Sequence, residues 1–240
     1  MKKAQLLEPQ KALRKLATPH KAAQQRRFFK TGPGQYGEGD VFIGVTVPEI
    51  RSISKQFKET DFKSIEQILK SEVHEDRLLG LLLLVHKFNT SKTPTHKKEV
   101  VDFYLQNKFA INNWDLVDVT VHKILGDYCF EQNNFQILEN LSNSSEHWSK
   151  RMAMVSTFAL IRRSKLDLTF QFAEKFLVEE EDLMHKATGW MLREAGKKDV
   201  SKLKEFISRF GAVMPRTMLR YSIEKFPEKE RKKILRETKQ

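Results

Sequence analysis

The segment with the clearest chemical character is Asn112-Asn113-Trp114-Asp115-Leu116-Val117-Asp118. An asparagine can cap a helix that starts here, and Asp115 in the first turn would then face the helix dipole. Asp118 lies deeper, where Asp is a poor helix former, and shares a helix face with Trp114 four residues earlier. A carboxylate beside an aromatic face is suited to stabilising a developing cation. The residues alone leave open the alternative that Asp118 forms a structural salt bridge.

Other chemical motifs are weak or missing from the sequence. Gly32 to Gly37 matches G-x-G-x-x-G, but it follows a helical segment and opens no helix, so we expect a loop there. The histidines have no zinc-binding spacing, and neither a P-loop nor a nucleophile elbow is present. Cys129, the single cysteine, lies in an apolar stretch and is expected to be a buried small hydrophobe. We therefore expect no metal and no cofactor, and a metal hydrolase, NTPase or esterase is poorly supported.

The elements that must position these residues are predicted to be helices. Apolar residues recur at three- and four-residue spacing, and glycine and proline are scarce. Asp61, Asn133, Asp167 and Asp182 are predicted N-caps. The predicted helices cover residues 48–57, 62–71, 75–89, 97–108, 114–130, 133–141, 148–164, 168–178, 183–198, 201–210, 215–225 and 228–237.

These helices fall into pairs, and the second members begin at intervals of 30 to 39 residues, near Glu75, Trp114, Trp148, His185 and Pro215. Such spacing is typical of an α-solenoid. The predicted fold is all-α: an α-α superhelix, a HEAT/armadillo-like solenoid of antiparallel helix pairs. It would form a single domain over residues 1–240, with a basic N-terminal segment at 1–21 and a Gly-rich loop at 31–47. The basic segment is either an ordered helix or a mobile arm, and an irregular helical bundle is the alternative fold.

The chain is strongly basic, with a formal net charge of +12 and a pI of about 9.6. Residues 1–30 hold nine Lys and Arg, Lys2 and Lys3 among them, against one acid. Such an excess indicates a polyanionic partner, with a nucleic acid first and an acidic membrane surface second. No secretory signal or bilayer-length apolar run is present, so we expect a cytoplasmic, nucleoid-associated protein without a membrane partner.

The predicted second helices would line the concave side of the solenoid. They carry unusual residues: Trp114, Asp118, Trp148, Arg151, Lys186, Trp190, Arg193, Arg216 and Arg220. A basic surface with aromatic residues could accept a DNA duplex, because Lys and Arg neutralise the phosphate backbone.

Several segments together resemble the AlkD-type family of bacterial alkylpurine DNA glycosylases, which act in DNA alkylation repair. Besides the W-D-x-V-D segment, they are Trp148 to Arg151, Lys186 to Glu194 (with G-W-x-L-R-E), Arg27 to Lys30 and Phe42 to Pro48. The similarity covers about residues 20 to 225. W-D-x-V-D and G-W-x-L-R-E, in this order and at this distance, form a fairly specific combination.

The resemblance implies a base-excision repair enzyme that hydrolyses the N-glycosidic bond of N3-alkyladenine or N7-alkylguanine in double-stranded DNA. Asp118 corresponds to the catalytic carboxylate, Trp114 and Trp190 to the cleft tryptophans, and Arg151 to the phosphate-contacting arginine. Phe28 stands where the family usually has tyrosine, which leaves a packing role without a hydroxyl. The cations expected to contact DNA are Lys30, Arg151, Lys186, Arg193, Arg216 and Arg220. We expect a monomer that needs no obligate protein partner.

Two other functions remain open from the sequence. Some members of this superfamily resemble non-catalytic binders of branched or damaged DNA, and an Asp118 paired with an arginine in the core would favour that function. A protein–protein scaffold is the third possibility, because most HEAT solenoids are scaffolds. The basic surface argues against the scaffold.

Overall fold

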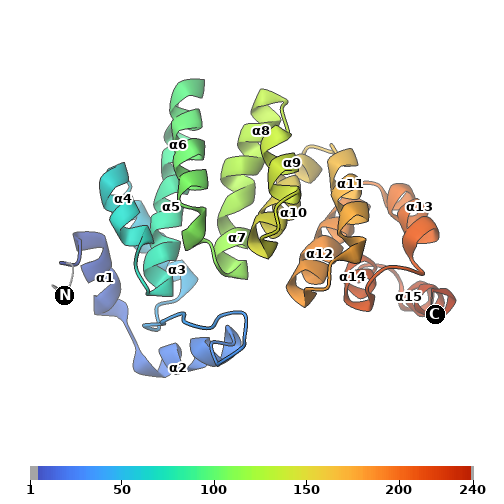
Figure 1. Cartoon of the computed structure of the whole chain (residues 1–240), viewed down its shortest axis with the longest axis horizontal. Helices are drawn as coiled ribbons and strands as arrows, with labels where there is room; N and C mark the ends of the chain where they lie inside the picture. The colour runs from blue at the N-terminus through green and yellow to red at the C-terminus, as the bar shows by residue number, and fades with distance from the viewer. Residues whose placement is uncertain (1–4, 239–240) are drawn as a thin grey trace. The chain divides into compact units, whose positions relative to one another are not determined.

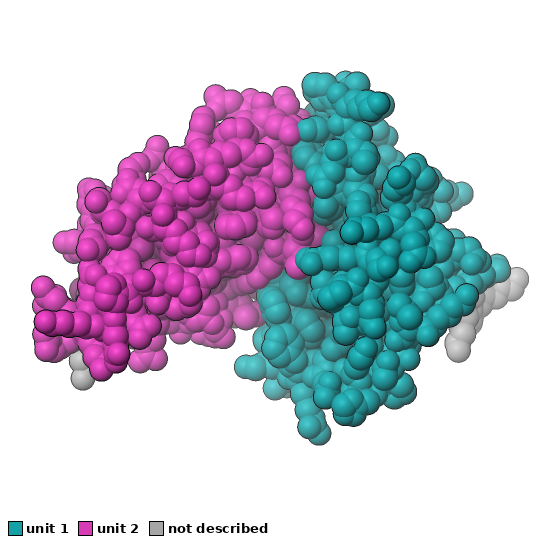
Figure 2. Space-filling model, turned by 180° about the vertical axis from the view of Figure 1, so that it is seen from behind, with its two compact units in different colours: residues 1–116 teal, residues 117–240 magenta. Residues whose placement is uncertain are grey.

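The computed structural model describes residues 5–238, so Lys2 and Lys3 of the basic N-terminal segment lie outside the described residues. The chain divides into two compact units, residues 1–116 (unit 1) and 117–240 (unit 2), which Figure 2 shows in different colours. The boundary falls inside one helix, α7 (Trp114–Val121). The single-domain organisation and the HEAT-like repeat stay predictions.

The predicted all-α fold is confirmed. Within residues 5–238, the only β pairing is an isolated bridge between Val41 and Val73. No helix of this part of the chain is long and apolar enough to cross a bilayer. Unit 1 contains α1 (Glu8–Leu16), α2 (Pro19–Phe28), α3 (Val47–Gln56), α4 (Phe62–Leu69), α5 (His74–Thr90), α6 (Pro94–Gln106), the 3-10 turn η1 (Lys108–Ala110) and the start of α7 (Figure 1).

Unit 2 continues α7 through a π-helical segment, η2 (His122–Gly126), directly into α8 (Asp127–Gln132). The prediction of one helix over 114–130 is therefore confirmed, apart from its π-helical turn. The remaining elements are α9 (Gln136–Ser142), α10 (His147–Arg162), α11 (Asp167–Lys175), η3 (Phe176–Val178), α12 (Asp182–Lys198), α13 (Val200–Phe210), α14 (Arg216–Ser222) and α15 (Glu228–Glu237).

In unit 1, α5 is the central helix and packs against α3, α4 and α6 (Figure 1). The apolar run of residues 78–85 on α5 is buried, as a helix that is apolar all round requires. The described part of the basic N-terminal segment is an ordered helix, because Leu13 of α1 is fully buried and Arg14 pairs with Asp76 of α5. Residues 31–46 form the expected loop before α3.

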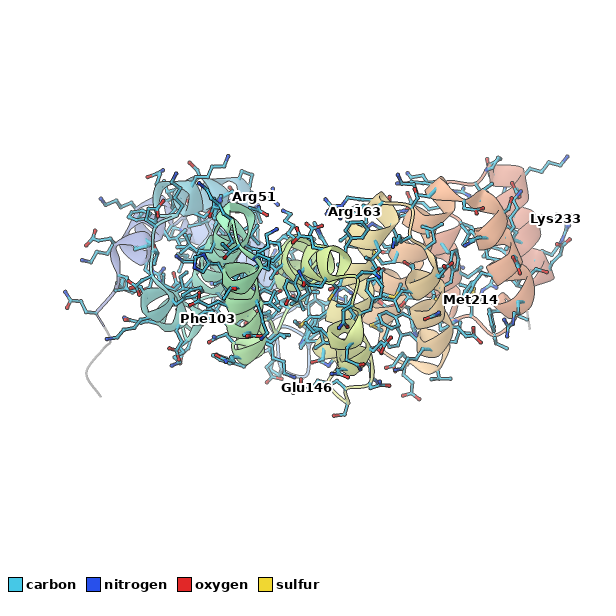
Figure 3. All side chains as sticks on the ribbon, turned by 90° about the horizontal axis from the view of Figure 1, so that it is seen from above. Arg51, Phe103, Glu146, Arg163, Met214 and Lys233 are labelled. Carbon is cyan, nitrogen blue, oxygen red and sulfur yellow. The ribbon has the colours of Figure 1, made fainter. Side chains whose placement is uncertain are left out.

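In unit 2, α10 packs against α9, α11, α12 and η2, and α12 packs against α14. The core of the last helices includes Leu192, Met218 and Leu219, all fully buried. Cys129 is fully buried, as expected, and burial raises the pKa of its thiol to about 12. Figure 3 shows Lys233 of α15 extending away from its helix, in keeping with its exposed position.

Of the four predicted N-caps, only Asp61 is confirmed. Asp167 and Asp182 are instead the first residues of α11 and α12, whose N-caps are Leu166 and Glu181. Asp61 caps α4, and its Oδ1 accepts a hydrogen bond of 2.8 Å from the Ser64 amide. Asn133 instead ends α8, in the left-handed conformation with φ of 47°. Asparagine tolerates this conformation better than other non-glycine residues, so it can terminate a helix as well as start one.

Candidate functional site

Asp118 of α7 and Arg151 of α10 form an ion pair within unit 2. Arg151 Nε donates to Asp118 Oδ1 at 3.1 Å, and Nη2 donates to Oδ2 at 2.8 Å. The third nitrogen, Nη1, donates to the backbone carbonyl of Leu183 on α12. The planar guanidinium therefore joins three helices and fixes the carboxylate in one orientation.

The burial of this pair bears on both sequence-based interpretations of Asp118. The Arg151 side chain is 6% exposed and that of Asp118 is 15% exposed. Arg151 is thus committed to protein partners, and a phosphate contact would have to use its small exposed fraction. Asp118 makes the salt bridge that the structural alternative required. Its side chain also remains partly accessible to solvent.

Trp190 of α12 lies in an aromatic row within unit 2. Its ring centroid is 5.9 Å from that of Phe158 on α10, and the Phe158 ring meets the His122 imidazole edge-on at 5.3 Å. The Arg162 guanidinium lies 5.6 Å from the Phe158 centroid, in cation–π range. Trp190 is half-buried.

Trp114 begins α7 and belongs to unit 1, where it meets two phenylalanines. It stacks on Phe29 with ring centroids 5.3 Å apart, and it meets Phe28 edge-on at 5.7 Å. Phe29 is buried and also stacks on Phe42, whereas Phe28 is 64% exposed. Phe28 therefore packs against Trp114 and leaves most of its own side chain exposed. Phe29, which the sequence analysis did not select, holds the tryptophan from the buried side.

A buried ionic network holds the start of α7 in unit 1. His74 lies between two carboxylates, with Nε2 2.9 Å from Asp115 Oδ2 and Nδ1 3.1 Å from Asp40 Oδ2. Asp40 also accepts hydrogen bonds from Arg77 at 2.5 Å and from Asn113 Nδ2 at 2.9 Å. Asp115 is only 5% exposed. Its principal partner is thus the His74 ring rather than the helix dipole alone.

Each charged group in this network stabilises the ionised form of its partners. Burial on its own would lower the pKa of His74, but the carboxylates of Asp115 and Asp40 outweigh it and raise that pKa to about 9. Burial would raise the pKa of Asp40, but the hydrogen bond with His74, the charge of Arg77 and the Asn113 amide lower it to about 2. His74 is therefore a buried imidazolium at neutral pH.

The next two residues of α5, Glu75 and Asp76, form hydrogen bonds with other segments of unit 1. The buried Glu75 carboxylate accepts hydrogen bonds from the backbone amides of residues 43, 44 and 45, at distances of 2.8 to 3.3 Å. Gly44 is required there, because its φ is +85° and an added Cβ would lie 2.1 Å from the Thr18 carbonyl oxygen. Asp76 binds Arg14 and Gln10 of α1.

Residues 74–77 thus connect α5 to α1, to the Gly-rich loop and to the helix that carries Trp114. This cluster was not predicted from the sequence. The available signal was a run of four ionisable residues, H-E-D-R, directly before the longest apolar run of the chain. Ionisable residues in such a position are buried only when they are paired.

The other predicted DNA-binding cations have different surroundings. Lys186 pairs with Asp182 at 2.6 Å, and Arg193 pairs with Glu194 and Glu224. The remaining three cations differ in whether their side chains are free to contact a phosphate. Arg216 donates to the carbonyls of residues 235 and 238, at 3.0 and 3.3 Å, and so caps the end of α15. Lys30 and Arg220 are exposed, and neither forms an ion pair or side-chain hydrogen bond with the described residues.

Comparisons with known proteins agree with this description. The family model of the DNA alkylation repair enzymes matches residues 9–226. No curated protein sequence matches the chain significantly. A solved structure described as a predicted DNA alkylation repair enzyme from Enterococcus faecalis is 20% identical in sequence and superposes with a TM-score of 0.69. The match covers 88% of this chain and 97% of that one, and it shows a shared fold.

The family match extends over most of the chain and includes Trp114, Asp118, Arg151 and Trp190. Membership supports a role in DNA repair, and with it DNA binding. The chain therefore belongs to the DNA alkylation repair enzyme family.

Proposed function

We propose that this protein is a DNA N-glycosylase that hydrolyses the N-glycosidic bond of cationic alkylpurines, N3-alkyladenine and N7-alkylguanine, in duplex DNA. The observation that carries the proposal is the geometry of Asp118. Arg151 orients its carboxylate by donating hydrogen bonds to both oxygens. The Asp118 side chain is nevertheless 15% exposed. An oriented, solvent-reachable carboxylate in a repair-enzyme family fits a reaction that develops positive charge.

The chemistry explains why a carboxylate would be enough. Alkylation leaves a formal positive charge on the purine, so the base departs as a neutral molecule and needs no protonation. The barrier then lies in the oxocarbenium character of the deoxyribose as the C1′–N bond lengthens. A preoriented negative charge stabilises that character more than it stabilises the ground state, which is the requirement for catalysis. Asp118 would also position the attacking water.

The tryptophans would add to this stabilisation. A cation over an indole face gains about 1–2 kcal/mol when the site is desolvated. Trp190 is half-buried in unit 2, and Trp114 is held by Phe29 in unit 1. Exposed cations such as Lys30 and Arg220 would neutralise phosphates and give sequence-independent binding.

Lesion choice provides the test of this proposal. If bond weakness rather than base-specific contacts selects the substrate, the protein releases N7-methylguanine and N3-methyladenine from methylated duplex DNA and leaves uracil in place. The experiment is a comparison of the three lesions with the purified protein. Efficient release of uracil would rule out the mechanism, because uracil is a neutral leaving group.

A second candidate is a non-catalytic protein that binds branched or damaged DNA. The observation in its favour is that Arg151 satisfies Asp118 as a structural ion pair. Tight DNA binding without base release would establish this alternative. In either case we propose a monomer with HEAT-like repeats that acts on the nucleoid in the cytoplasm without a cofactor.

A further inference from the structure

His122 is a buried histidine to which the proposed mechanism gives no role. It follows α7 directly and opens the π-helical segment η2, in which the Asp127 amide donates to the His122 carbonyl. The residue is 9% exposed. Single π-helical turns inside α-helices are rare and occur frequently at functional sites.

The Nδ1 atom of His122 is buried and has no hydrogen-bonding partner among the described residues. Leaving such an atom unpaired costs about 1–3 kcal/mol, so a ring needed only for packing would be better served by phenylalanine. The neighbouring unpaired atoms differ in kind. Arg77 and Asp115 belong to the ionic network of unit 1, Gln25 is already held by a hydrogen bond from its Nε2 to the Val45 carbonyl, and Thr169 and Thr188 carry neutral hydroxyls.

His122 lies one helical turn after Asp118. The two residues are four apart along one helix, so their Cβ atoms are about 5–6 Å apart on the same face. Helical side chains lean toward the N-terminus, which brings the imidazole back over the turn of Asp118. One water that hydrogen-bonds to both groups spans about 5.6 Å between them, so the separation suits a shared water.

The same faces of α10 and α12 repeat this two-layer arrangement. The layer of Asp118 contains Arg151 and the Leu183 carbonyl. Seven residues further along each of these helices lie Phe158 and Trp190, which form the aromatic row with His122. His122 is therefore part of the same face as the proposed catalytic carboxylate and Trp190.

We propose that His122 is a further residue of the reaction site, whose unprotonated Nδ1 accepts a hydrogen bond from the attacking water while that water donates its other proton to Asp118. The role of this water as the nucleophile rests on the proposed glycosylase function. The presence of a water between His122 and Asp118 does not depend on that function. Two donated hydrogen bonds would leave the lone pairs of the water oxygen free to face the sugar.

The step balances without a further reactant. The water oxygen forms a bond to C1′ as the C1′–N bond breaks, and the bonding pair leaves with the purine and neutralises its charge. The released proton passes to Asp118 and then to solvent. His122 is unprotonated at neutral pH and can accept the hydrogen bond, because burial and the charges of Lys123 and Arg162 lower its pKa to about 4, against the opposing charge of Asp127.

Two substitutions distinguish the contribution of the Nδ1 atom from that of the aromatic ring. His122→Phe keeps the aromatic packing and removes Nδ1, and His122→Asn keeps a polar atom at the same number of bonds from Cα. We expect the Phe variant to lose on the order of tenfold to a hundredfold in single-turnover base release, with unchanged DNA affinity and undiminished thermal stability. The Asn variant should recover part of the rate. His147→Phe, on an exposed histidine of α10, is the matched control and should behave as wild type.

Nitrogen-15 NMR of the wild-type protein gives a readout that needs no activity. The Nδ1 resonance, assigned by its loss in His122→Phe, should be that of an unprotonated nitrogen with the proton on Nε2, and the ring should show a cross-peak to water. A protonated Nδ1, or no contact with water, overturns the proposal, as does full activity of His122→Phe. If the water is found but the wild type releases no alkylpurine, the water site stands and the proposed function fails.

Discussion

The buried imidazolium of His74 makes a quantitative prediction about stability and pH. Its pKa is about 9 in the folded protein, against 6.5 for an exposed histidine. Between these two values the folded state binds a proton that the unfolded chain has released, so the stability decreases as pH rises. The contribution of His74 is fully present below about pH 6.5 and is lost as pH rises through about 9.

The size of the effect follows from the same shift. Each pKa unit corresponds to about 1.36 kcal/mol, so the shift from 6.5 to about 9 corresponds to about 3 kcal/mol of unfolding free energy. We expect wild type to lose most of this amount between about pH 6.5 and about pH 9.5, as measured by urea unfolding. Cys129 adds a smaller decline near the top of this window, because its thiol, whose pKa is raised to about 12 in the folded protein, releases its proton at lower pH in the unfolded chain.

The substitution His74→Gln isolates this contribution. The variant should be less stable than wild type near neutral pH, and over the same pH window its stability should fall only by the contribution of Cys129. His20→Gln, on the exposed surface of α2, is the control and should keep the wild-type slope. Equal slopes for wild type and His74→Gln would refute the conclusion that Asp40 and Asp115 hold a proton on His74.

Three further predictions concern the backbone, the ion pair and DNA binding. Gly44→Ala should lose at least about 2 kcal/mol of unfolding free energy in urea, because its Cβ meets a carbonyl, whereas Gly34→Ala, with a similar φ of +71° but open space, should lose about 1 kcal/mol. Arg151→Met should cost about 3 kcal/mol or more by breaking a largely buried ion pair, and a loss below about 1 kcal/mol would contradict the geometry. Lys30→Gln and Arg220→Gln should each lower the slope of log affinity for DNA against log salt by about 1, for any DNA sequence, and an unchanged slope would exclude a phosphate contact.

Most of the helices could be predicted from the sequence because each depends on local periodicity. The 75–89 window corresponds to α5 within a residue at each end, since its apolar run and flanking polar residues mark its limits. The π-helical turn after α7 could not be predicted. There Gly126 approaches α10 so closely that an added Cβ would lie 2.4 Å from the Ser156 carbonyl oxygen, a contact between distant parts of the sequence.

The residues of the site could be predicted from the sequence, but the contacts between their side chains could not. The W-D-x-V-D segment identified Asp118, but its pairing with Arg151 joins positions 33 apart and depends on how α7 and α10 pack. His74 drew no attention because its partners, Asp40 and Asp115, lie 34 and 41 residues away. Side-chain pairing across such separations is set by tertiary packing, on which periodicity gives no information.

The most direct test of the glycosylase proposal is single-turnover release of N7-methylguanine from methylated duplex DNA by wild type and Asp118→Asn, with DNA affinity measured for both. The proposal predicts release by wild type and a loss of about a hundredfold or more in the variant at similar affinity, equivalent to about 2.7 kcal/mol of transition-state stabilisation. Equal rates in the two proteins, or tight DNA binding without release by either, would contradict it.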